Sequence, residues 1–133
     1  MDYRDFFQTA FGPAPFDYQV RFATDESFYS LVKAPTGAGK TATIIGGFLW
    51  KRLHHPDRVG RRLIYCLPMR TLVEQTREVT EAALKNLVAA GLIEANRFQV
   101  CVLMGGAVSD EWDNEPERET ILIGTQDCCC RAL

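Results

Sequence analysis

Apolar residues along this chain follow two patterns, one with helical spacing and one with short continuous runs. Helical spacing predicts helices over residues 2–11, over residues 15–23, from residue 39 onward, and from residue 69 to about residue 90. Continuous apolar runs predict strands at residues 28–32, 63–67, 99–104 and 120–123. Because strands alternate with helical stretches, the pattern predicts an α/β protein built on a parallel sheet.

The same pattern predicts which side chains are buried. The strand at residues 63–67 is expected to be buried on both faces, and Cys66 and Cys101 are interpreted as buried strand residues. Residues 53–60 and 109–119 are expected to form polar connections. The buried side of the long helix is expected to consist of Leu72, Val73, Val79, Ala83, Leu84, Leu87 and Val88.

Length and composition bound the class of protein. The 133 residues suffice for one domain, spanning 1–133, and 47% hydrophobic with 24% charged residues is ordinary for a soluble globular chain. The sequence shows no apolar run long enough to cross a bilayer and no signal peptide, so we expect a cytoplasmic protein without a membrane partner. A formal charge of −2 gives no global attraction to nucleic acid.

Residues 34–41 read Ala-Pro-Thr-Gly-Ala-Gly-Lys-Thr and stand between a predicted strand and a predicted helix, the context of a phosphate-binding loop. Glycines let successive backbone N–H groups curl around an anion, and the helix start adds its positive dipole end. Lys40 is expected to reach the phosphates, and Thr41 to ligate Mg²⁺ through the nucleotide. The remaining loop residues expected to contact phosphate are Pro35, Thr36, Gly37, Ala38 and Gly39. The alternative is a glycine-containing turn that binds nothing.

Phe16 and Gln19 precede this loop and are candidates for adenine recognition. A side-chain amide can pair twice with the adenine edge, and an aromatic ring can cover the base. The alternative is a helix start with core aromatics. Cys128, Cys129 and Cys130 are adjacent but lack a second pair of ligands, so inert or oxidisable thiols are favoured over a metal site. His54 and His55 are interpreted as solvated loop residues.

Together these residues resemble the first RecA-like domain of a superfamily 2 helicase. Phe16 and Gln19 match its adenine motif, and residues 34–41 match motif I, with Ala34 where the general phosphate loop has Gly. Residues 68–75 resemble motif Ia, Gly105-Gly106 match the glycine pair, and Gly124-Thr125 match the start of motif Ib. The resemblance implies ATP and Mg²⁺ as cofactors, with Lys40 and Thr41 as catalytic residues. It implies single-stranded DNA contacts at Pro68, Arg70, Thr71, Gly105, Gly106, Gly124, Thr125 and Gln126.

A narrower resemblance is to the helicase part of the CRISPR-associated type I effector helicase. It is carried by residues 15–19, 66–70, 103–106 and 123–127, which read Pro-Phe-Asp-Tyr-Gln, Cys-Leu-Pro-Met-Arg, Leu-Met-Gly-Gly and Ile-Gly-Thr-Gln-Asp. That family translocates on target DNA recruited by a guide-RNA surveillance complex. The resemblance therefore implies ATP-driven DNA unwinding as the parent activity and such a complex as a partner.

The chain departs from the family at its C-terminal side. No segment resembles motif II, whose carboxylates hold Mg²⁺ and orient water, and no second RecA-like domain follows. We therefore expect a partial domain, an early-terminated product or a fragment, that binds nucleotide without turnover unless a second polypeptide supplies the rest. A non-catalytic interaction protein that docks a surveillance complex or competes with the full helicase is the alternative. A small nucleotide kinase is disfavoured because no cluster of acceptor-site arginines follows the loop.

The resemblance also implies a gap in the sheet. The strands of motifs II and III would lie between the phosphate-loop strand and the motif Ia strand. Without them, the backbone edges and the apolar side chains of Leu31, Val32, Ile64 and Leu67 would be exposed. We therefore expect the isolated chain to be marginally stable, oligomeric or prone to aggregation, and to need a partner to be well ordered.

Overall fold

The alternation of helices and strands expected from the sequence is present in the computed structural model, which describes residues 2–25, 39–57, 59–67, 69–104, 107–108 and 118–125. The predicted strand at residues 28–32 lies outside this part of the chain. The helices are α1 (Tyr3–Phe11), α2 (Asp17–Thr24), α3 (Lys40–His54) and α4 (Arg70–Ala89). The strands are β1 (Arg62–Leu67), β2 (Phe98–Met104), β3 (Ala107–Val108) and β4 (Glu119–Thr125). The short strand β3 was not predicted.

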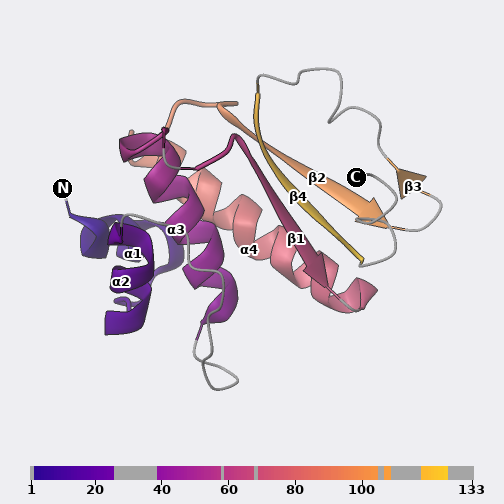
Figure 1. The fold of residues 1–133 in the computed structure, drawn as a ribbon, viewed down its shortest axis with the longest axis horizontal. Helices are drawn as coiled ribbons and strands as arrows, with labels where there is room; N and C mark the ends of the chain where they lie inside the picture. Colours follow the sequence, from indigo (N-terminus) through magenta and orange to yellow (C-terminus); the bar gives the residue numbers. More distant parts are fainter. Residues whose placement is uncertain are drawn as a thin grey trace.

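The four strands form one sheet in the order β1-β4-β2-β3 (Figure 1). β4 lies between β1 and β2 and is parallel to both, while β3 pairs antiparallel with β2. Ile64 of β1 is level with Leu122 of β4, which in turn is level with Cys101 of β2. The parallel α/β fold class is therefore confirmed, as a mixed α/β structure with a three-stranded parallel sheet consistent with a partial RecA-like domain.

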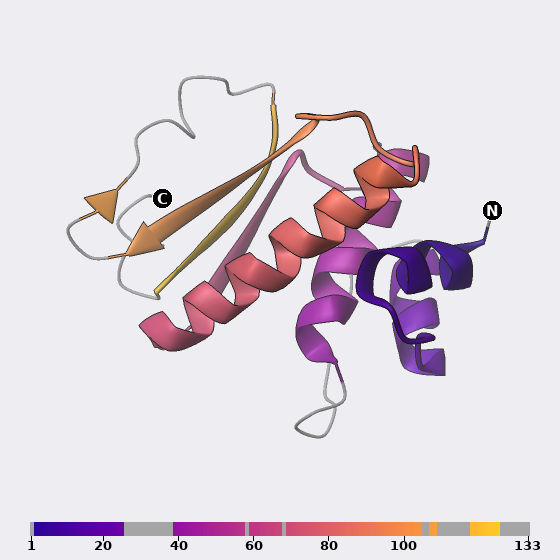
Figure 2. The ribbon, with the colours of Figure 1, turned by 180° about the vertical axis from the view of Figure 1, so that it is seen from behind.

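Helix α4 lies across one face of the three parallel strands, as Figure 2 shows. α1 packs against α3 and α4, and α2 packs against α3. Two glycines in the middle of α3 permit this close approach. A Cβ added to Gly46 would lie 2.6 Å from the Tyr3 hydroxyl, and one added to Gly47 would lie 2.5 Å from the Phe22 ring. A larger residue at either position would therefore force the Tyr3 or Phe22 side chain to shift.

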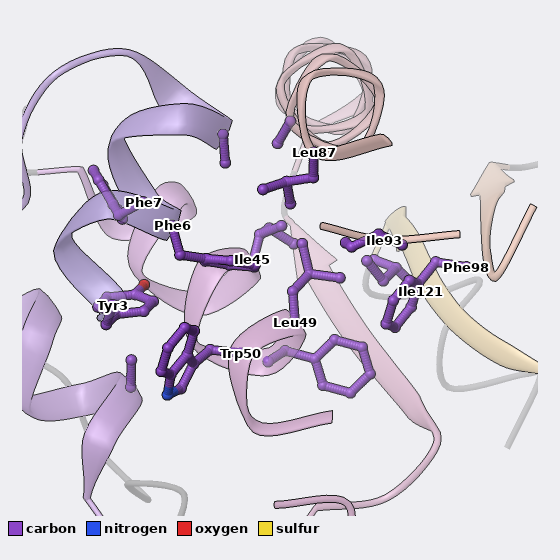
Figure 3. Packing of buried hydrophobic residues seen from close by; sticks show 14 of the residues in the cluster. Tyr3, Phe6, Phe7, Ile45, Leu49, Trp50, Leu87, Ile93, Phe98 and Ile121 are labelled. Atoms are coloured by element: carbon purple, nitrogen blue, oxygen red, sulfur yellow. The ribbon is translucent and has the colours of Figure 1, made fainter. Parts of the chain in front are cut away.

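The hydrophobic core joins all these layers (Figure 3). Trp50 makes edge-to-face contacts with Tyr3 and Phe6, at ring-centroid distances of 5.5 Å and 5.3 Å. Ile45 and Leu49 on the same helix are fully buried. Burial of these side chains and of the aromatic rings removes apolar surface from water and stabilises the fold by several kcal/mol, at ~25 cal/mol per Å². α3 is therefore anchored along its length, which fixes the position of its first residues.

The prediction that β1 is buried on both faces is wrong. Its burial alternates, and Ile64 and Cys66 are exposed, Ile64 with 36% of its surface accessible. The residues level with Ile64 on the next two strands, Leu122 of β4 and Cys101 of β2, are buried, as was predicted for Cys101. Figure 1 shows no described helix in front of these strands. A continuous apolar run identifies a strand, but it does not supply the layer that would cover β1.

The prediction for the buried side of α4 is partly wrong. Leu72 and Val79 are exposed, whereas Thr76 and Thr80 are buried. The buried residues are Val73, Thr76, Thr80, Ala83 and Leu87. Their spacing alternates between three and four residues and traces one straight stripe. Threonine can be buried in this stripe because its hydroxyl forms a hydrogen bond within the helix. Thr80 Oγ1 donates to the Thr76 carbonyl oxygen at 2.7 Å.

The predicted connection at residues 53–60 starts too early, because α3 continues to His54. His54 is therefore a helical residue, with its ring 3.9 Å from the Trp50 ring. The predicted loop at residues 109–119 likewise ends too late, because Glu119 begins β4. One ion cluster links these two boundaries. Glu119 accepts from Arg52 Nε at 2.7 Å and from Arg97 Nε at 2.8 Å, which ties the end of α3 to the starts of β2 and β4.

Candidate functional site

The side chain of Gln19 connects the start of α2 with the start of α3. Its Oε1 accepts a hydrogen bond of 2.8 Å from the backbone N–H of Phe16, which precedes α2. Its Nε2 donates a hydrogen bond of 3.0 Å to the carbonyl oxygen of Gly39, which precedes α3. Gln19 is 2% exposed, so neither bond competes with bulk water. The amide thus fixes the position of the two helix starts relative to each other.

Gly39 occupies a backbone conformation that favours glycine, with φ 77° and ψ 38°. A Cβ at this position would lie 2.7 Å from Gln19 Nε2, so a larger residue would displace the bridging amide. The Gly39 carbonyl also accepts from the backbone N–H of Thr43 at 2.9 Å and from its hydroxyl at 2.8 Å. These contacts hold the last residues of the predicted phosphate loop in one conformation.

Lys40 and Thr41 form the first turn of α3 immediately after this glycine. Lys40 is exposed, and Thr41 is half-buried. The Thr41 hydroxyl lies 3.5 Å from the Tyr65 hydroxyl of β1. The unpaired N–H groups and the dipole of a helix of this length make its N-terminus favourable for an anion, and Lys40 adds a full positive charge there. The predicted catalytic pair therefore stands where a phosphate group would be stabilised.

Two aromatic rings lie beside Gln19. Phe16 is 57% exposed and stacks on Tyr18, with ring centroids 6.2 Å apart and planes 10° apart. The Tyr18 hydroxyl lies 3.4 Å from the Thr43 hydroxyl, so this ring also contacts the first turns of α3. Phe16 therefore offers an open ring face next to the buried amide, rather than a core aromatic.

The described residues among those predicted to contact nucleic acid lie at the start of α4 and the end of β4, at the carboxyl end of the sheet. Leu67 is level with Thr125, so the two strands end side by side. α4 begins at Arg70, and both Arg70 and Thr71 are exposed. Thr125 is half-buried and Gly124 is buried. The carboxyl ends of parallel strands are where α/β sheets bind ligands, and the structure puts these four residues there.

Several predicted site residues lie outside the described part of the chain, and their predictions stay open. They are Pro35, Thr36, Gly37, Ala38, Pro68, Gly105, Gly106 and Gln126. Cys128, Cys129 and Cys130 lie outside it as well. Within the ranges that are described, no group of three His, Cys, Asp or Glu residues could hold a metal ion, and no helix is long and apolar enough to cross a membrane.

The residues at the start of α3 fit a magnesium ion that arrives with a nucleotide. Mg²⁺ prefers oxygen ligands, keeps several waters, and is bound by one or two protein groups together with substrate phosphates. Thr41 supplies one such hydroxyl at the helix start, and the backbone turn at Gly39 has no room for a Cβ. One neutral hydroxyl cannot hold the ion alone. The chemistry therefore suits Mg²⁺–nucleotide rather than free Mg²⁺.

Three residues at this site were missed by sequence reasoning, namely Tyr18, Thr43 and Tyr65. Each contributes a hydroxyl at the start of α3. Thr43 had a usable signal, because a threonine four residues after a helix start commonly bonds to the carbonyl of that start. Tyr65 had none, because its contact depends on how β1 packs against α3 across 24 residues of sequence.

The sequence profile described as DEAD/DEAH box helicase matches residues 19–132 of the chain. The match begins at Gln19 and includes the starts of α3 and α4 and the strands β1 to β4. No curated protein and no solved structure matches the chain.

Proposed function

The chain belongs to the DEAD/DEAH box helicase family, and we propose that it binds ATP–Mg²⁺ at the start of α3 as the nucleotide-binding portion of a DNA helicase. The family implies an ATP-binding, helicase-type function, and its members generally use ATP and Mg²⁺. The observation that carries the proposal for this chain is the Gln19 side chain, which joins Phe16 to Gly39, near the C-terminal end of the predicted phosphate loop.

In this proposal one set of side chains binds the adenine base and another set binds the phosphates. A side-chain amide has two N–H groups and two lone pairs, and the described hydrogen bonds of Gln19 use one of each. The second N–H and lone pair are what an adenine edge requires, and the exposed Phe16 ring is placed to cover the base. Lys40 contacts phosphate oxygens, and Thr41 provides a ligand for the accompanying Mg²⁺.

A second part of the proposal concerns single-stranded DNA. Arg70 and Thr71 start α4, and Thr125 ends β4, at one edge of the sheet. A cation, hydroxyls and backbone N–H groups at helix starts can hold phosphates without reading bases. We propose that this edge contacts the DNA backbone. We further propose that the DNA is a target recruited by a guide-RNA surveillance complex, as the resemblance of residues 15–19, 66–70, 103–106 and 123–127 to the CRISPR-associated type I helicase implies.

The open edge of β1 supports a further partner. In the described part of the sheet β1 pairs only with β4, and its side chains Ile64 and Cys66 are exposed. An unpaired strand edge beside exposed apolar groups is a surface that additional strands stabilise. We propose that more of the helicase domain, as further chain or a second polypeptide, packs there and supplies the carboxylates that hydrolysis requires.

Nucleotide binding is tested on the 133-residue chain by thermal shift and calorimetric titration with ATP–Mg²⁺. At ATP concentrations ~100-fold above Kd, binding should stabilise the fold by about 2.7 kcal/mol. Lys40→Ala should remove most of the shift. Lys85→Ala is the matched control, because Lys85 is an exposed lysine near the far end of α4. No saturable shift at millimolar ATP–Mg²⁺ would contradict the proposal.

DNA binding is tested by fluorescence anisotropy with a labelled oligothymidylate. Arg70→Ala should weaken binding and reduce its salt dependence, because each lost phosphate contact reduces the slope by about 0.7 for single strands. Lys85→Ala serves again as the control. Equal binding by all three proteins would place the DNA contact elsewhere on the chain.

A further inference from the structure

The Thr41 hydroxyl at the start of α3 faces a second hydroxyl that comes from the sheet. Tyr65 lies on β1, level with the buried Ile123 of β4. Its ring packs against the hydrophobic core, and its oxygen lies 3.5 Å from Thr41 Oγ1. Because the ring is held by the core, the position of the phenolic oxygen is set by the sheet and not by the loop that precedes α3.

The proton of a metal-binding hydroxyl has to point away from the metal. A threonine hydroxyl has one proton and two lone pairs, so one lone pair faces the cation and the proton is donated to an acceptor on another side. Thr43, two residues later, donates its proton to the Gly39 carbonyl. The Thr41 hydroxyl lies within hydrogen-bonding distance of the Tyr65 hydroxyl oxygen. The two threonines of this turn therefore differ in where their protons can go.

We propose that Tyr65 is a positioning residue for magnesium binding, whose phenolic oxygen accepts the Thr41 proton and so directs a Thr41 lone pair at the nucleotide-bound Mg²⁺. This inference rests on the proposed nucleotide function of the same site. Groups that orient a metal ligand change metal affinity even though they do not touch the metal. Without metal, either hydroxyl can donate to the other, so the contact does not depend on the ion. With metal bound, the direction of donation is fixed from Thr41 to Tyr65.

A purely structural role for the Tyr65 hydroxyl makes a different prediction. If the hydroxyl only held β1 against α3, its removal would lower the melting temperature and weaken nucleotide binding equally with and without metal. A positioning role affects only the part of the affinity that Mg²⁺ contributes. The ratio of ATP affinity with Mg²⁺ to ATP affinity in EDTA therefore separates the two roles.

The experiment measures ATP binding calorimetrically in millimolar Mg²⁺ and in EDTA for five proteins: the wild-type chain, Tyr65→Phe, Tyr18→Phe, Thr41→Ala, and the double variant of Tyr65→Phe with Thr41→Ala. Tyr65→Phe should leave the EDTA affinity unchanged and lower the magnesium-dependent gain about threefold to tenfold, the size of one hydrogen bond. Tyr18→Phe is the matched control, because it removes a hydroxyl that faces Thr43 instead of Thr41. Adding Tyr65→Phe to Thr41→Ala should have no further effect on the gain.

The outcomes distinguish this inference from the proposed function. If wild type binds ATP–Mg²⁺ and Tyr65→Phe keeps the full magnesium-dependent gain, the positioning role is wrong and the nucleotide function stands. A loss in Tyr65→Phe that is equal in EDTA and in Mg²⁺ also overturns it, in favour of the structural role. If wild type binds no ATP under either condition, the nucleotide function itself is wrong, and the inference is overturned with it.

Discussion

Gln19 Nε2 donates to the carbonyl oxygen of Gly39 across 20 residues of sequence, while Gln19 Oε1 caps the start of α2. One buried amide therefore determines how the helix that carries Phe16 meets the helix that carries Lys40. Because both bonds are shielded from water, loss of the amide leaves the Phe16 N–H without this acceptor. The contact has a structural role, and the proposed function gives it a binding role as well, so substitutions should separate the two.

Gln19→Ala should lower the free energy of unfolding by about 1–3 kcal/mol, because it removes two hydrogen bonds from a buried site. It should also weaken ATP binding, whereas the affinity for inorganic triphosphate, which has no base, should fall less. Urea denaturation and competitive nucleotide titration measure the two effects. An equal loss of affinity for ATP and triphosphate would show that Gln19 acts only through the fold.

Gly39→Ala should be more damaging than Gly91→Ala, although the two glycines have nearly the same positive backbone φ, 77° and 76°. A Cβ at Gly91 meets no atom within 4 Å, whereas a Cβ at Gly39 would lie 2.7 Å from Gln19 Nε2. Both variants incur the backbone cost of about 1–2 kcal/mol, and only Gly39→Ala also displaces the amide.

The comparison is made by urea denaturation of the two single variants and of Gly39→Ala combined with Gln19→Ala. The difference between the two alanine variants measures the collision with the amide. In the double variant that collision is absent. Its loss of unfolding free energy should therefore be smaller than the sum of the losses in Gly39→Ala and Gln19→Ala. Equal losses for Gly39→Ala and Gly91→Ala would mean that the amide moves aside at no cost.

The sequence predicted where helices and strands lie better than it predicted what covers them. Helical spacing found α1, α2, α3 and α4, and apolar runs found β1, β2 and β4. The buried stripe of α4 was misplaced because hydropathy alone favours Leu72 and Val79 as buried residues. In the structure these two are exposed, and Thr76 and Thr80 are buried instead. Burial depends on the direction of packing against α1 and the sheet, which a helical period does not contain.

For the candidate site, too, the sequence predicts the residues better than it predicts their contacts. The spacing of Phe16, Gln19, Lys40 and Thr41 predicts a nucleotide site, because each residue type carries its chemistry in its side chain. The partners of these residues were not predictable. Gln19 bonds to a backbone carbonyl, and Tyr65 meets Thr41 only through the packing of β1 against α3. The ion cluster of Arg52, Arg97 and Glu119 joins three segments, and no local pattern marks it.

Glu119→Gln should lower stability by roughly 3 kcal/mol near neutral pH, because it leaves Arg52 and Arg97 without their shared carboxylate in a largely buried site. An amide can accept through one oxygen only and presents an NH₂ group to the second arginine. Asp17→Asn is the control, because the Asp17–Arg4 pair is exposed and should contribute no more than ~1 kcal/mol. Urea denaturation of both variants measures the difference.

The same cluster predicts how stability depends on pH. Burial raises the pKa of the Glu119 carboxyl, but hydrogen bonds from Arg97 and Arg52 outweigh it, so this pKa lies below its ordinary value of 4.5. A carboxyl whose pKa is lower in the folded state stabilises the fold above its unfolded pKa and loses this effect as pH falls through its folded pKa. Wild type should therefore lose stability below about pH 5 more steeply than Glu119→Gln. Parallel acid curves would contradict this assignment.

The 133-residue chain should bind ATP without hydrolysing it, at any concentration of DNA. We expect its acidic segment Asp110-Glu111-Trp112-Asp113 to lie in a loop and not to act as motif II, and loss of the group that orients the attacking water costs several orders of magnitude in rate. A coupled phosphate-release assay measures this directly, with Lys40→Ala as the control for contaminating activity. Hydrolysis at helicase-like rates that Lys40→Ala abolishes would overturn the prediction.

The outer edge of β1 should exchange its amide hydrogens faster than the inner edge. The Thr120 N–H donates to the Arg61 carbonyl, and amides alternate in direction along a parallel strand, so those of Leu63 and Tyr65 should point toward β4. The amides of Ile64 and Cys66 then point away from β4, where the described part of the sheet offers no partner. Hydrogen exchange followed by NMR should show slow exchange at Leu63 and Tyr65 and fast exchange at Ile64 and Cys66. Slow exchange at all four positions in a monomer would mean that this edge is already paired, and the proposed partner strand would have no place to bind.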